Sequence, residues 1–241
     1  MSFTKNLSPA AILLFIPFFA IVFFSFYHLK KARLQAKRTA VHQQVGKPFP
    51  ALPLFNRQNT TAGQQLLQKE TTIIDFWYRN CPQCIAEMQQ FPQVLKGKED
   101  KVDIVSVSID DEASWQKVLA GQFEPLKVIS NPVANWRQLR VDFAGATNEP
   151  NARQLANVLG VKSYPAFFVL DKNGIIKDVP ASAVNYIETS YNKRNEFWVY
   201  ATSRSAWQSP QTWLMVLLAV FIYQFLYKQV LLVVQKKQAA N

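Results

Sequence analysis

The residues best suited to chemistry are Cys81 and Cys84, which are the only cysteines in the 241-residue chain. Two residues separate them. A short, mostly apolar run at residues 73–77 comes before them and is typical of a buried strand, and residues 85–95 after them are compatible with a helix. A strand, a Cys-x-x-Cys pair and a helix, in this order, are typical of a dithiol redox site.

A position at the start of a helix would give the two thiols different roles. We expect Pro82 in the first helical turn, where its missing N–H would have no partner anyway. The free N–H groups and the helix dipole would then stabilise a thiolate on Cys81, the exposed attacking thiol. Cys84, one turn later, would be the resolving thiol that breaks the mixed disulfide. The charge of Arg79 could lower the thiol pKa further.

Two other uses of the cysteines are a metal site and an inert structural disulfide. Tetrahedral zinc needs four ligands, and the sequence has no second cysteine pair. The only histidines, His28 and His42, precede the expected domain, and a copper site would need a histidine or methionines near the dithiol. We therefore predict no metal and no cofactor apart from a redox-active disulfide, while the inert disulfide stays open as an alternative.

Composition allows one packed domain of roughly 150 residues with segments left over, because 49% of the residues are hydrophobic and 13% aromatic. The formal net charge is +11. No zinc-finger spacing or basic motif interleaved with aromatics is present, so we expect no nucleic-acid partner. Part of the charge follows a long apolar run, where cations meet lipid headgroups: Lys30, Lys31, Arg33, Lys37 and Arg38.

That apolar run, residues 9–27, predicts an uncleaved membrane anchor. It carries no charge, and nineteen residues at about 1.5 Å rise span roughly 28 Å, close to the hydrocarbon core. It is too long for the apolar part of a signal peptide, and no small-x-small cleavage site follows. Residues 213–227 and 230–234 predict a second membrane helix, with an interfacial helix as the alternative.

The predicted organisation has five parts: an anchor (1–29), a basic juxtamembrane spacer (30–44), the dithiol domain (45–191), a linker (192–211) and the second membrane helix (212–235). Within the domain we expect strands at residues 51–55, 71–77, 102–109, 126–130, 166–170 and 175–179. We expect helices at residues 84–95, 113–120, 135–141 and 152–159, and a last one from a Ser182 cap to residue 191.

Two separated motifs resemble the thioredoxin superfamily. The first is Asp75-Phe76-Trp77 followed by Cys81-Pro82-Gln83-Cys84, and the second is Tyr164-Pro165-Ala166-Phe167-Phe168-Val169 with the turn at residues 171–174. Residues 45–50 and the acid Glu87 are similar to the membrane-anchored TlpA/ResA branch, which includes thioredoxins of cytochrome c maturation. The resemblance implies an α/β thioredoxin fold, a central mixed sheet flanked by helices. Asn80 departs from it, since the family usually has tryptophan before the first cysteine.

The resemblance also implies roles for the matching residues. Pro165 would be a cis-proline facing the disulfide, and Tyr164 would present its backbone to the substrate. Asp75 would be a buried acid with a raised pKa that exchanges a proton with Cys84, and Glu87 would tune the thiols. The remaining candidate substrate contacts are Pro82, Gln83 and Trp77, for which a packing role is the alternative.

We therefore expect a membrane-tethered thiol–disulfide oxidoreductase, with a reductase favoured by the resemblance. Its partners would be protein thiols and disulfides, an upstream thiol electron donor and membrane lipid. The alternatives are a redox-inactive binding or assembly module and a metallochaperone. The resemblance places the domain on the periplasmic side of a bacterial inner membrane, whereas the basic residues after the first span favour the opposite topology.

Overall fold

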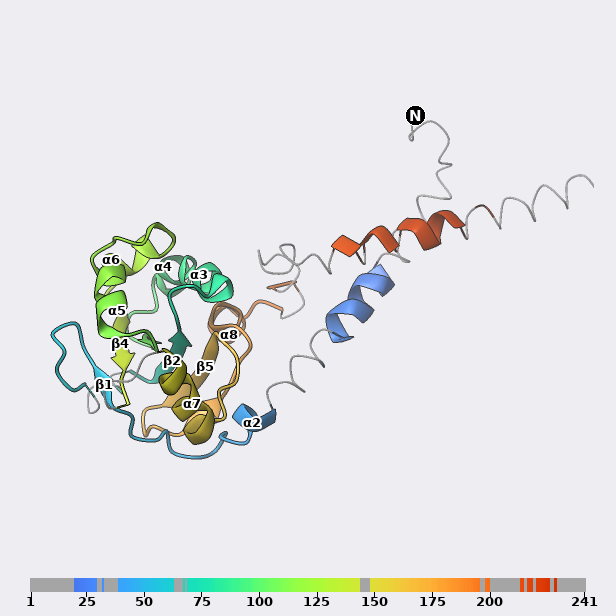
Figure 1. Ribbon diagram of the computed structural model, residues 1–241. Coiled ribbons are helices and arrows are strands. Elements are labelled where there is room, and N and C mark those ends of the chain that lie inside the picture. The colour runs from blue at the N-terminus through green and yellow to red at the C-terminus, as the bar shows by residue number, and fades with distance from the viewer. Residues whose placement is uncertain are drawn as a thin grey trace, which may run out of the picture. The chain divides into compact units, whose positions relative to one another are not determined.

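The computed structural model describes residues 20–29, 32, 39–62, 67, 69–143, 148–195, 198–199, 213–214, 216–218, 220–225 and 228 (Figure 1). The chain divides into two compact units. One comprises Met1–Ala36 and Tyr200–Asn241, and the other comprises Lys37–Val199. The second unit contains both cysteines, and we call it the core domain.

The core domain is built on a six-stranded sheet with the strand order β1-β4-β3-β2-β5-β6. The strands are Leu54–Phe55 (β1), Thr71–Trp77 (β2), Val102–Ser108 (β3), Trp136–Val141 (β4), Ala166–Asp171 (β5) and Ile176–Asp178 (β6). Strands β2, β3 and β4 are parallel neighbours, while β1, β5 and β6 pair antiparallel to theirs. The strand that leads to the cysteines, β2, is therefore an interior strand of a mixed sheet.

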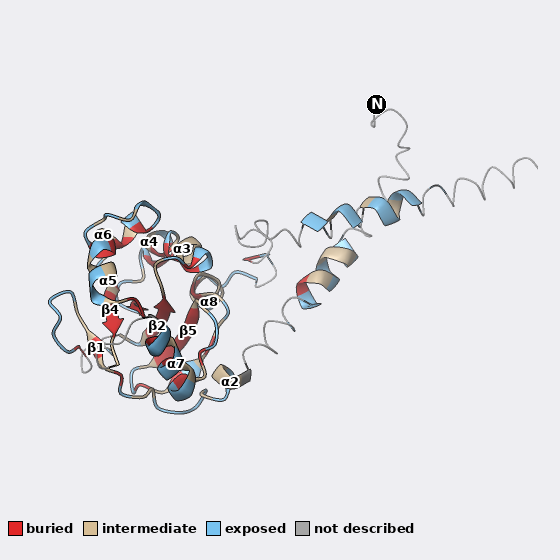
Figure 2. Ribbon diagram, viewed as in Figure 1, coloured by how far each residue is buried: buried red, intermediate tan, exposed pale blue. Residues whose placement is uncertain are grey.

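Helices pack on both faces of this sheet, as the alternation of β2 requires. Ile73 and Trp77 point into one core cluster and Ile74 and Phe76 into the other. The first cluster, which we call the cysteine-side core, contains both cysteines and the buried side chains of five helices: Pro82–Met88 (α3), Phe91–Leu95 (α4), Glu112–Leu119 (α5), Lys127–Ser130 (α6) and Ala183–Ser190 (α8). The second receives Asn148–Leu159 (α7), and Val41 of Thr39–His42 (α2) packs against it. Figure 2 shows β2, β4 and β5 buried among the helices.

Several predicted elements are confirmed, together with the signals that begin and end them. The strands predicted at residues 71–77, 102–109 and 166–170 are β2, β3 and β5. Asp111 caps α5 by accepting a hydrogen bond from the N–H of Ser114 at 2.8 Å, and Ser182 caps α8 through the N–H of Asn185 at 3.1 Å. Gly160 ends α7 with a φ of +74°, a conformation that favours glycine.

The single helix predicted at residues 84–95 is wrong. It is two helices, because α3 ends at Met88 and α4 begins at Phe91. Pro92 stands in the first turn of α4. A proline has no N–H to donate to the carbonyl of Met88, so an unbroken helix could not pass this point, whereas the first turn of a new helix tolerates it.

Two further predictions are wrong, and both concern the chain between α5 and α7. The strand predicted at residues 126–130 is helical, a 3-10 turn at Glu124–Leu126 followed by α6. The helix predicted at residues 135–141 is strand β4. Its arginine, glutamine and leucine favour helices locally, but pairing with β3 on one side and β1 on the other overrides that preference.

No helix among the described residues is long and apolar enough to cross a membrane. Residues 9–19 of the first predicted span lie outside the described residues, as do residues 212, 215, 219, 226–227 and 229–235 of the second. Residues 20–29 are helical, and so are those described between 213 and 225. The two spans stay predictions.

Candidate functional site

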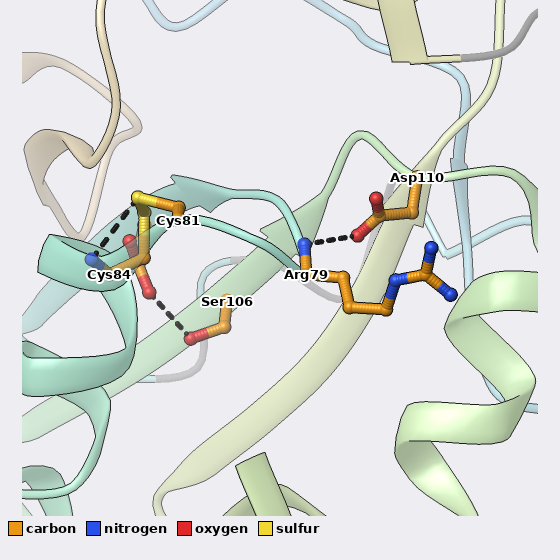
Figure 3. Close-up of a disulfide and its surroundings, with 6 residues drawn as sticks. Arg79, Cys81, Cys84, Ser106 and Asp110 are labelled. Atoms are coloured by element: carbon orange, nitrogen blue, oxygen red, sulfur yellow. Dashed lines mark hydrogen bonds between the residues drawn. A yellow bond between two sulfur atoms is a disulfide. The ribbon is translucent and has the colours of Figure 1, made fainter. Parts of the chain in front are cut away.

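Cys81 and Cys84 form a disulfide at the N-terminus of α3, with their Cα atoms 5.2 Å apart (Figure 3). Cys81 is the N-cap residue in an extended conformation, and Pro82 occupies the first turn. The N–H of Cys84 donates to the Sγ of Cys81 at 3.2 Å. The Cys81 sulfur therefore lies where the helix N-terminus would stabilise a thiolate once the disulfide is reduced.

The prediction of an exposed Cys81 is wrong for this oxidised state. Cys81 and Cys84 are each 1% exposed, and both belong to the cysteine-side core. Closing the disulfide within the first turn places the Cys81 sulfur against the backbone of Cys84. The exposed residues around the pair are Asn80, Pro82 and Gln83. A protein partner would meet these three residues first.

The peptide bond between Tyr164 and Pro165 is cis, as the resemblance implied. The Tyr164 ring packs against the cysteine-side core and forms an edge contact with Tyr78, with the ring centroids 5.6 Å apart. Its hydroxyl is buried without a hydrogen-bond partner among the described residues. Burial, with a smaller effect of Tyr78, raises the pKa of Tyr164, so this phenol stays protonated.

Asp75 is a buried acid on the same side of the sheet as the cysteines. It lies between Ile73 and Trp77 on β2, both of which face the cysteine-side core. One oxygen, Oδ2, accepts a hydrogen bond from the Ser106 hydroxyl at 2.9 Å, and Oδ1 has no hydrogen-bond partner among the described residues. Burial raises the pKa of Asp75 to about 8; the Ser106 hydrogen bond opposes this rise, and the charge of Glu87 adds to it. An acid with this pKa can both take up and release a proton near neutral pH.

Glu87 is half-buried on α3, three residues after Cys84. Its Oε2 accepts a hydrogen bond from the backbone N–H of Val184, in the first turn of α8, at 3.2 Å. It is therefore not a free surface acid, because it connects the helix of the cysteines to α8. Its charge also reaches Asp75 and favours the protonated form there.

Two other residues near the cysteines have positions that bear on the roles predicted for them. The Arg79 side chain points away from the disulfide (Figure 3). The pKa of Asp111 is lowered mainly by its hydrogen bond from the Ser114 N–H, and the charge of Arg79 adds to this effect. The structure gives no support to an effect of Arg79 on the thiols. Trp77 is 0% exposed in the cysteine-side core. It has no surface for a protein substrate, and its position fits the packing role.

Sequence reasoning missed three residues that hold the site. The Asp110 carboxylate accepts bonds from the Arg79 N–H at 2.7 Å and from the Ser108 hydroxyl at 2.9 Å, and so fixes the approach to Cys81. Ser106 contacts Asp75, and the Trp136 indole donates to Ser106 at 2.9 Å. The available signal is a pair of serines in a strand rich in β-branched apolar residues, because buried hydroxyls require partners.

A metal centre finds no support in the described part of the chain, where no three histidine, cysteine, aspartate or glutamate side chains gather in a metal-binding arrangement. The two histidines, His28 and His42, lie on different units from each other. The Cys81–Cys84 disulfide can exchange with another dithiol, and its reduced form with another disulfide.

Several known proteins resemble part of this chain. The chain is 23% identical over 136 residues to the thioredoxin-like protein YneN of Bacillus subtilis. This match covers 56% of the chain and 71% of YneN. The thioredoxin domain of the thiol-disulfide oxidoreductase BVU-2223 of Bacteroides vulgatus is 18% identical, with a TM-score of 0.48, over 63% of this chain and 98% of that one. A thiol:disulfide interchange protein from a Bacteroides species is 18% identical, with a TM-score of 0.47, and the match covers 61% of this chain and 90% of that one.

Residues 45–179 also match the family described as the AhpC/TSA family. This range is more than half of the chain and includes both cysteines, Asp75 and the cis Tyr164–Pro165 bond. Together with the Cys81–Cys84 disulfide, the match confirms the predicted enzyme class, a protein-disulfide oxidoreductase of thioredoxin-like fold. The chain belongs to the AhpC/TSA family.

Proposed function

We propose that this protein is a membrane-tethered reductase of protein disulfides, with Cys81 as the attacking thiol and Cys84 as the resolving thiol. The observation that carries the proposal is the Cys81–Cys84 disulfide at the N-terminus of α3, on the same side of the sheet as the buried acid Asp75. A buried acid with a raised pKa on the same side of the sheet as the cysteines is typical of a reactive site and favours this proposal over a redox-inactive binding module.

The proposed reaction consumes the reduced form of the protein. The Cys81 thiolate attacks one sulfur of the substrate disulfide, which forms a mixed disulfide and releases one substrate thiolate. Asp75 then accepts the proton of the Cys84 thiol, and the Cys84 thiolate attacks the Cys81 sulfur. The Cys81–Cys84 disulfide forms, and the second substrate thiolate leaves and takes up a proton. The dithiol loses two electrons and the substrate disulfide gains them, so an upstream thiol donor must restore the dithiol.

The exposed residues at the site agree with a protein as substrate. Asn80, Pro82 and Gln83 surround the disulfide and carry no charge, so they neither attract nor repel a partner by charge. Contact would then depend on shape and on backbone hydrogen bonds, and the cis Tyr164–Pro165 segment is the candidate for the latter. Tyr164 and Pro165 are both partly exposed.

Membrane attachment is supported by the apolar runs at residues 9–27 and 213–234 and by the basic residues after the first run. The described parts of these segments also expose large apolar side chains, among them Ile21 and Phe24 in the first and Leu217 and Phe221 in the second. Exposed apolar faces of this kind require apolar surroundings. We propose a bacterial inner membrane with the core domain in the periplasm, on the resemblance to the TlpA/ResA branch; the basic residues after the first run favour the opposite side.

Reduction of insulin disulfides by the full-length protein in detergent tests the proposed activity. The wild type should reduce insulin with a thiol donor present, and both Cys81→Ser and Cys84→Ser should lose turnover. The matched control is Thr189→Val, which removes a hydroxyl that donates to backbone carbonyls of α8. A wild type no more active than Cys81→Ser would refute the proposal. Retention of a stoichiometric metal ion by the reduced protein would favour a metallochaperone.

A further inference from the structure

Three buried side chains on adjacent strands form a hydrogen-bonded chain that ends at Asp75. The Trp136 indole of β4 donates to the Ser106 hydroxyl oxygen of β3 at 2.9 Å, and the Ser106 hydroxyl donates to Oδ2 of Asp75 on β2 at 2.9 Å. The side chains are 1%, 0% and 1% exposed, in that order. Asp75 and Ser106 are direct partners in the parallel register of β2 and β3, so the backbone holds the pair in place.

The chemistry of the three groups gives this chain one direction. An indole N–H can only donate, so the Ser106 oxygen must accept from Trp136. The single Ser106 proton is then left for Oδ2 of Asp75, its acceptor among the described residues. The Trp136 contact therefore prevents the serine hydroxyl from turning its proton toward the indole. Oδ2 is held in the role of acceptor whether or not the carboxyl group is ionised.

The other oxygen of Asp75, Oδ1, is buried and has no hydrogen-bond partner among the described residues. A buried carboxylate oxygen without a partner is unfavourable, and a proton on it removes the charge. Since Ser106 occupies Oδ2, the proton belongs on Oδ1. The two oxygens of this carboxyl group are therefore not equivalent.

The surroundings of Asp75 otherwise contain few charges. The element that carries both cysteines, α3, contributes Glu87, whose charge favours the protonated form of Asp75. The neighbouring strands contribute uncharged groups: Ser106 from β3, Trp136 from β4 and Phe167, the register partner of Asp75 on β5. The residues of α8 in the same core, Ala183 and Ile187, are apolar. Ser106 is thus the polar contact that opposes burial and Glu87.

We propose that Ser106, oriented by Trp136, is a positioning residue that makes Oδ1 of Asp75 the oxygen that exchanges a proton with the Cys84 thiol. This inference rests on the proposed function, in which Cys84 must lose its proton before it attacks Cys81. In that step the proton moves from the Cys84 sulfur to Oδ1, and the electron pair left on sulfur forms the new bond to Cys81. Ser106 and Trp136 transfer no proton themselves.

The direct test is the titration of Asp75 in the oxidised full-length protein, where neither cysteine titrates. Carboxyl NMR of protein labelled with carbon-13 aspartate, assigned with Asp75→Asn, gives the midpoint. Loss of a hydrogen bond to the ionised form should raise the midpoint by about one pH unit in Ser106→Ala. Trp136→Phe, which keeps the ring but not the N–H, should shift it in the same direction by less. The matched control is Ser108→Ala, which removes a buried hydroxyl bonded to Asp110 instead and should leave the midpoint unchanged.

Kinetics provide the second readout. Reduced protein mixed with a chromogenic aromatic disulfide should release two thiolates in sequence, and the second release reports the attack of Cys84 on Cys81. The pH profile of this second phase should move in Ser106→Ala by the same amount as the NMR midpoint. If Asp75 titrates with the same midpoint in Ser106→Ala as in Ser108→Ala, the positioning role of Ser106 is overturned. If the NMR midpoint of Asp75 shifts in Ser106→Ala but the pH profile of the second phase stays the same, the link to Cys84 is overturned. Absence of insulin reduction by the wild type would refute the proposed function but would leave the titration decisive for the positioning of Asp75.

Discussion

Glu87 of α3 accepts a hydrogen bond from the backbone N–H of Val184, 97 residues later in the chain, at 3.2 Å. Val184 lies in the first turn of α8, where unpaired N–H groups and the helix dipole favour a negative charge. The same carboxylate raises the pKa of Asp75. One side chain therefore connects the packing of the domain to the proton chemistry of the dithiol.

Replacement of Glu87 should affect stability and the acid together. Glu87→Ala leaves the Val184 N–H without its partner and should lower the free energy of unfolding by about 1–2 kcal/mol. It should also lower the pKa of Asp75, because a repelling charge is removed. Urea unfolding and the NMR titration of Asp75 measure the two effects. The control Glu149→Ala breaks an exposed ion pair with Arg153 and should lower the free energy of unfolding by less than about 0.5 kcal/mol. An equal loss of unfolding free energy in both variants would contradict the role given to Glu87.

Asp75 should make the protein less stable as the pH rises. Its pKa is raised from 3.8 to about 8 on folding, so the folded state holds a proton that the unfolded state releases. Below the pKa of the unfolded state, Asp75 does not lower the free energy of unfolding. As the pH rises, Asp75 lowers this free energy increasingly, and the effect levels off above the pKa of the folded state. At about pH 7 the cost is of the order of 4 kcal/mol, since one pKa unit corresponds to about 1.4 kcal/mol.

The comparison of Asp75→Asn with the wild type isolates this effect. The oxidised variant should be more stable than the wild type by a few kcal/mol near pH 8, and the difference should shrink toward acid pH. Urea unfolding between about pH 4 and pH 8 follows it. Asp100→Asn, on the exposed surface, should change stability by less than about 0.5 kcal/mol throughout. If the difference in unfolding free energy between Asp75→Asn and the wild type does not depend on pH, the raised pKa of Asp75 is contradicted.

Asp110 should be needed to hold the approach to Cys81. Asp110→Ala removes the acceptor of both the Arg79 N–H and the Ser108 hydroxyl. Because both donors are buried or half-buried, the loss should be about 2–4 kcal/mol of unfolding free energy. The neighbouring Asp111→Ala removes only the N-cap of α5 and should cost about 1 kcal/mol. Equal losses in thermal or urea unfolding would mean that Asp110 contributes no more than an ordinary cap.

Membrane sidedness can be measured because the protein has only two thiols. After mild reduction of intact spheroplasts, a membrane-impermeant thiol reagent should label the wild type if the core domain faces the periplasm. Labelling before reduction should be absent if the resting state is the disulfide. The Cys81→Ser, Cys84→Ser double variant is the background control. Labelling that requires permeabilised membranes would place the domain in the cytoplasm, as the basic residues after the first run suggest.

The parts of the fold that sequence alone predicts well are those determined by nearby residues. Strand β2 was predicted with its observed ends, Thr71 and Trp77, because a run of apolar and β-branched residues ends at the cysteine motif. The Asp111 and Ser182 caps are also local signals. In contrast, β4 becomes a strand through its pairing with β3, which lies about 30 residues earlier. The residues between Trp136 and Val141 favour a helix, so the local pattern does not identify the strand.

The same distinction applies to the site. Cys81, Cys84 and the cis bond before Pro165 are in short motifs and were predicted. The partners of Asp75 were not, because Ser106 meets it through the strand register and Trp136 was assigned to a helix. The burial of Cys81 does not follow from the motif, because it depends on the position of its sulfur, which is bonded to Cys84 and accepts the Cys84 N–H.

The most direct test of thiol–disulfide exchange through Cys81 is to trap the mixed disulfide with a disulfide-bonded protein. Full-length Cys84→Ser, reduced and mixed with insulin, should form one covalent adduct per chain that reducing agent releases, because Cys81 can attack but no thiol can resolve the product. Cys81→Ser should form little adduct under the same conditions, since its remaining thiol, Cys84, lies inside α3 and not at the N-cap, where the free N–H groups and the helix dipole favour a thiolate. Intact-mass measurement of both variants gives the result. Adduct formation by Cys81→Ser at the rate of Cys84→Ser, or by neither variant, would contradict the proposal.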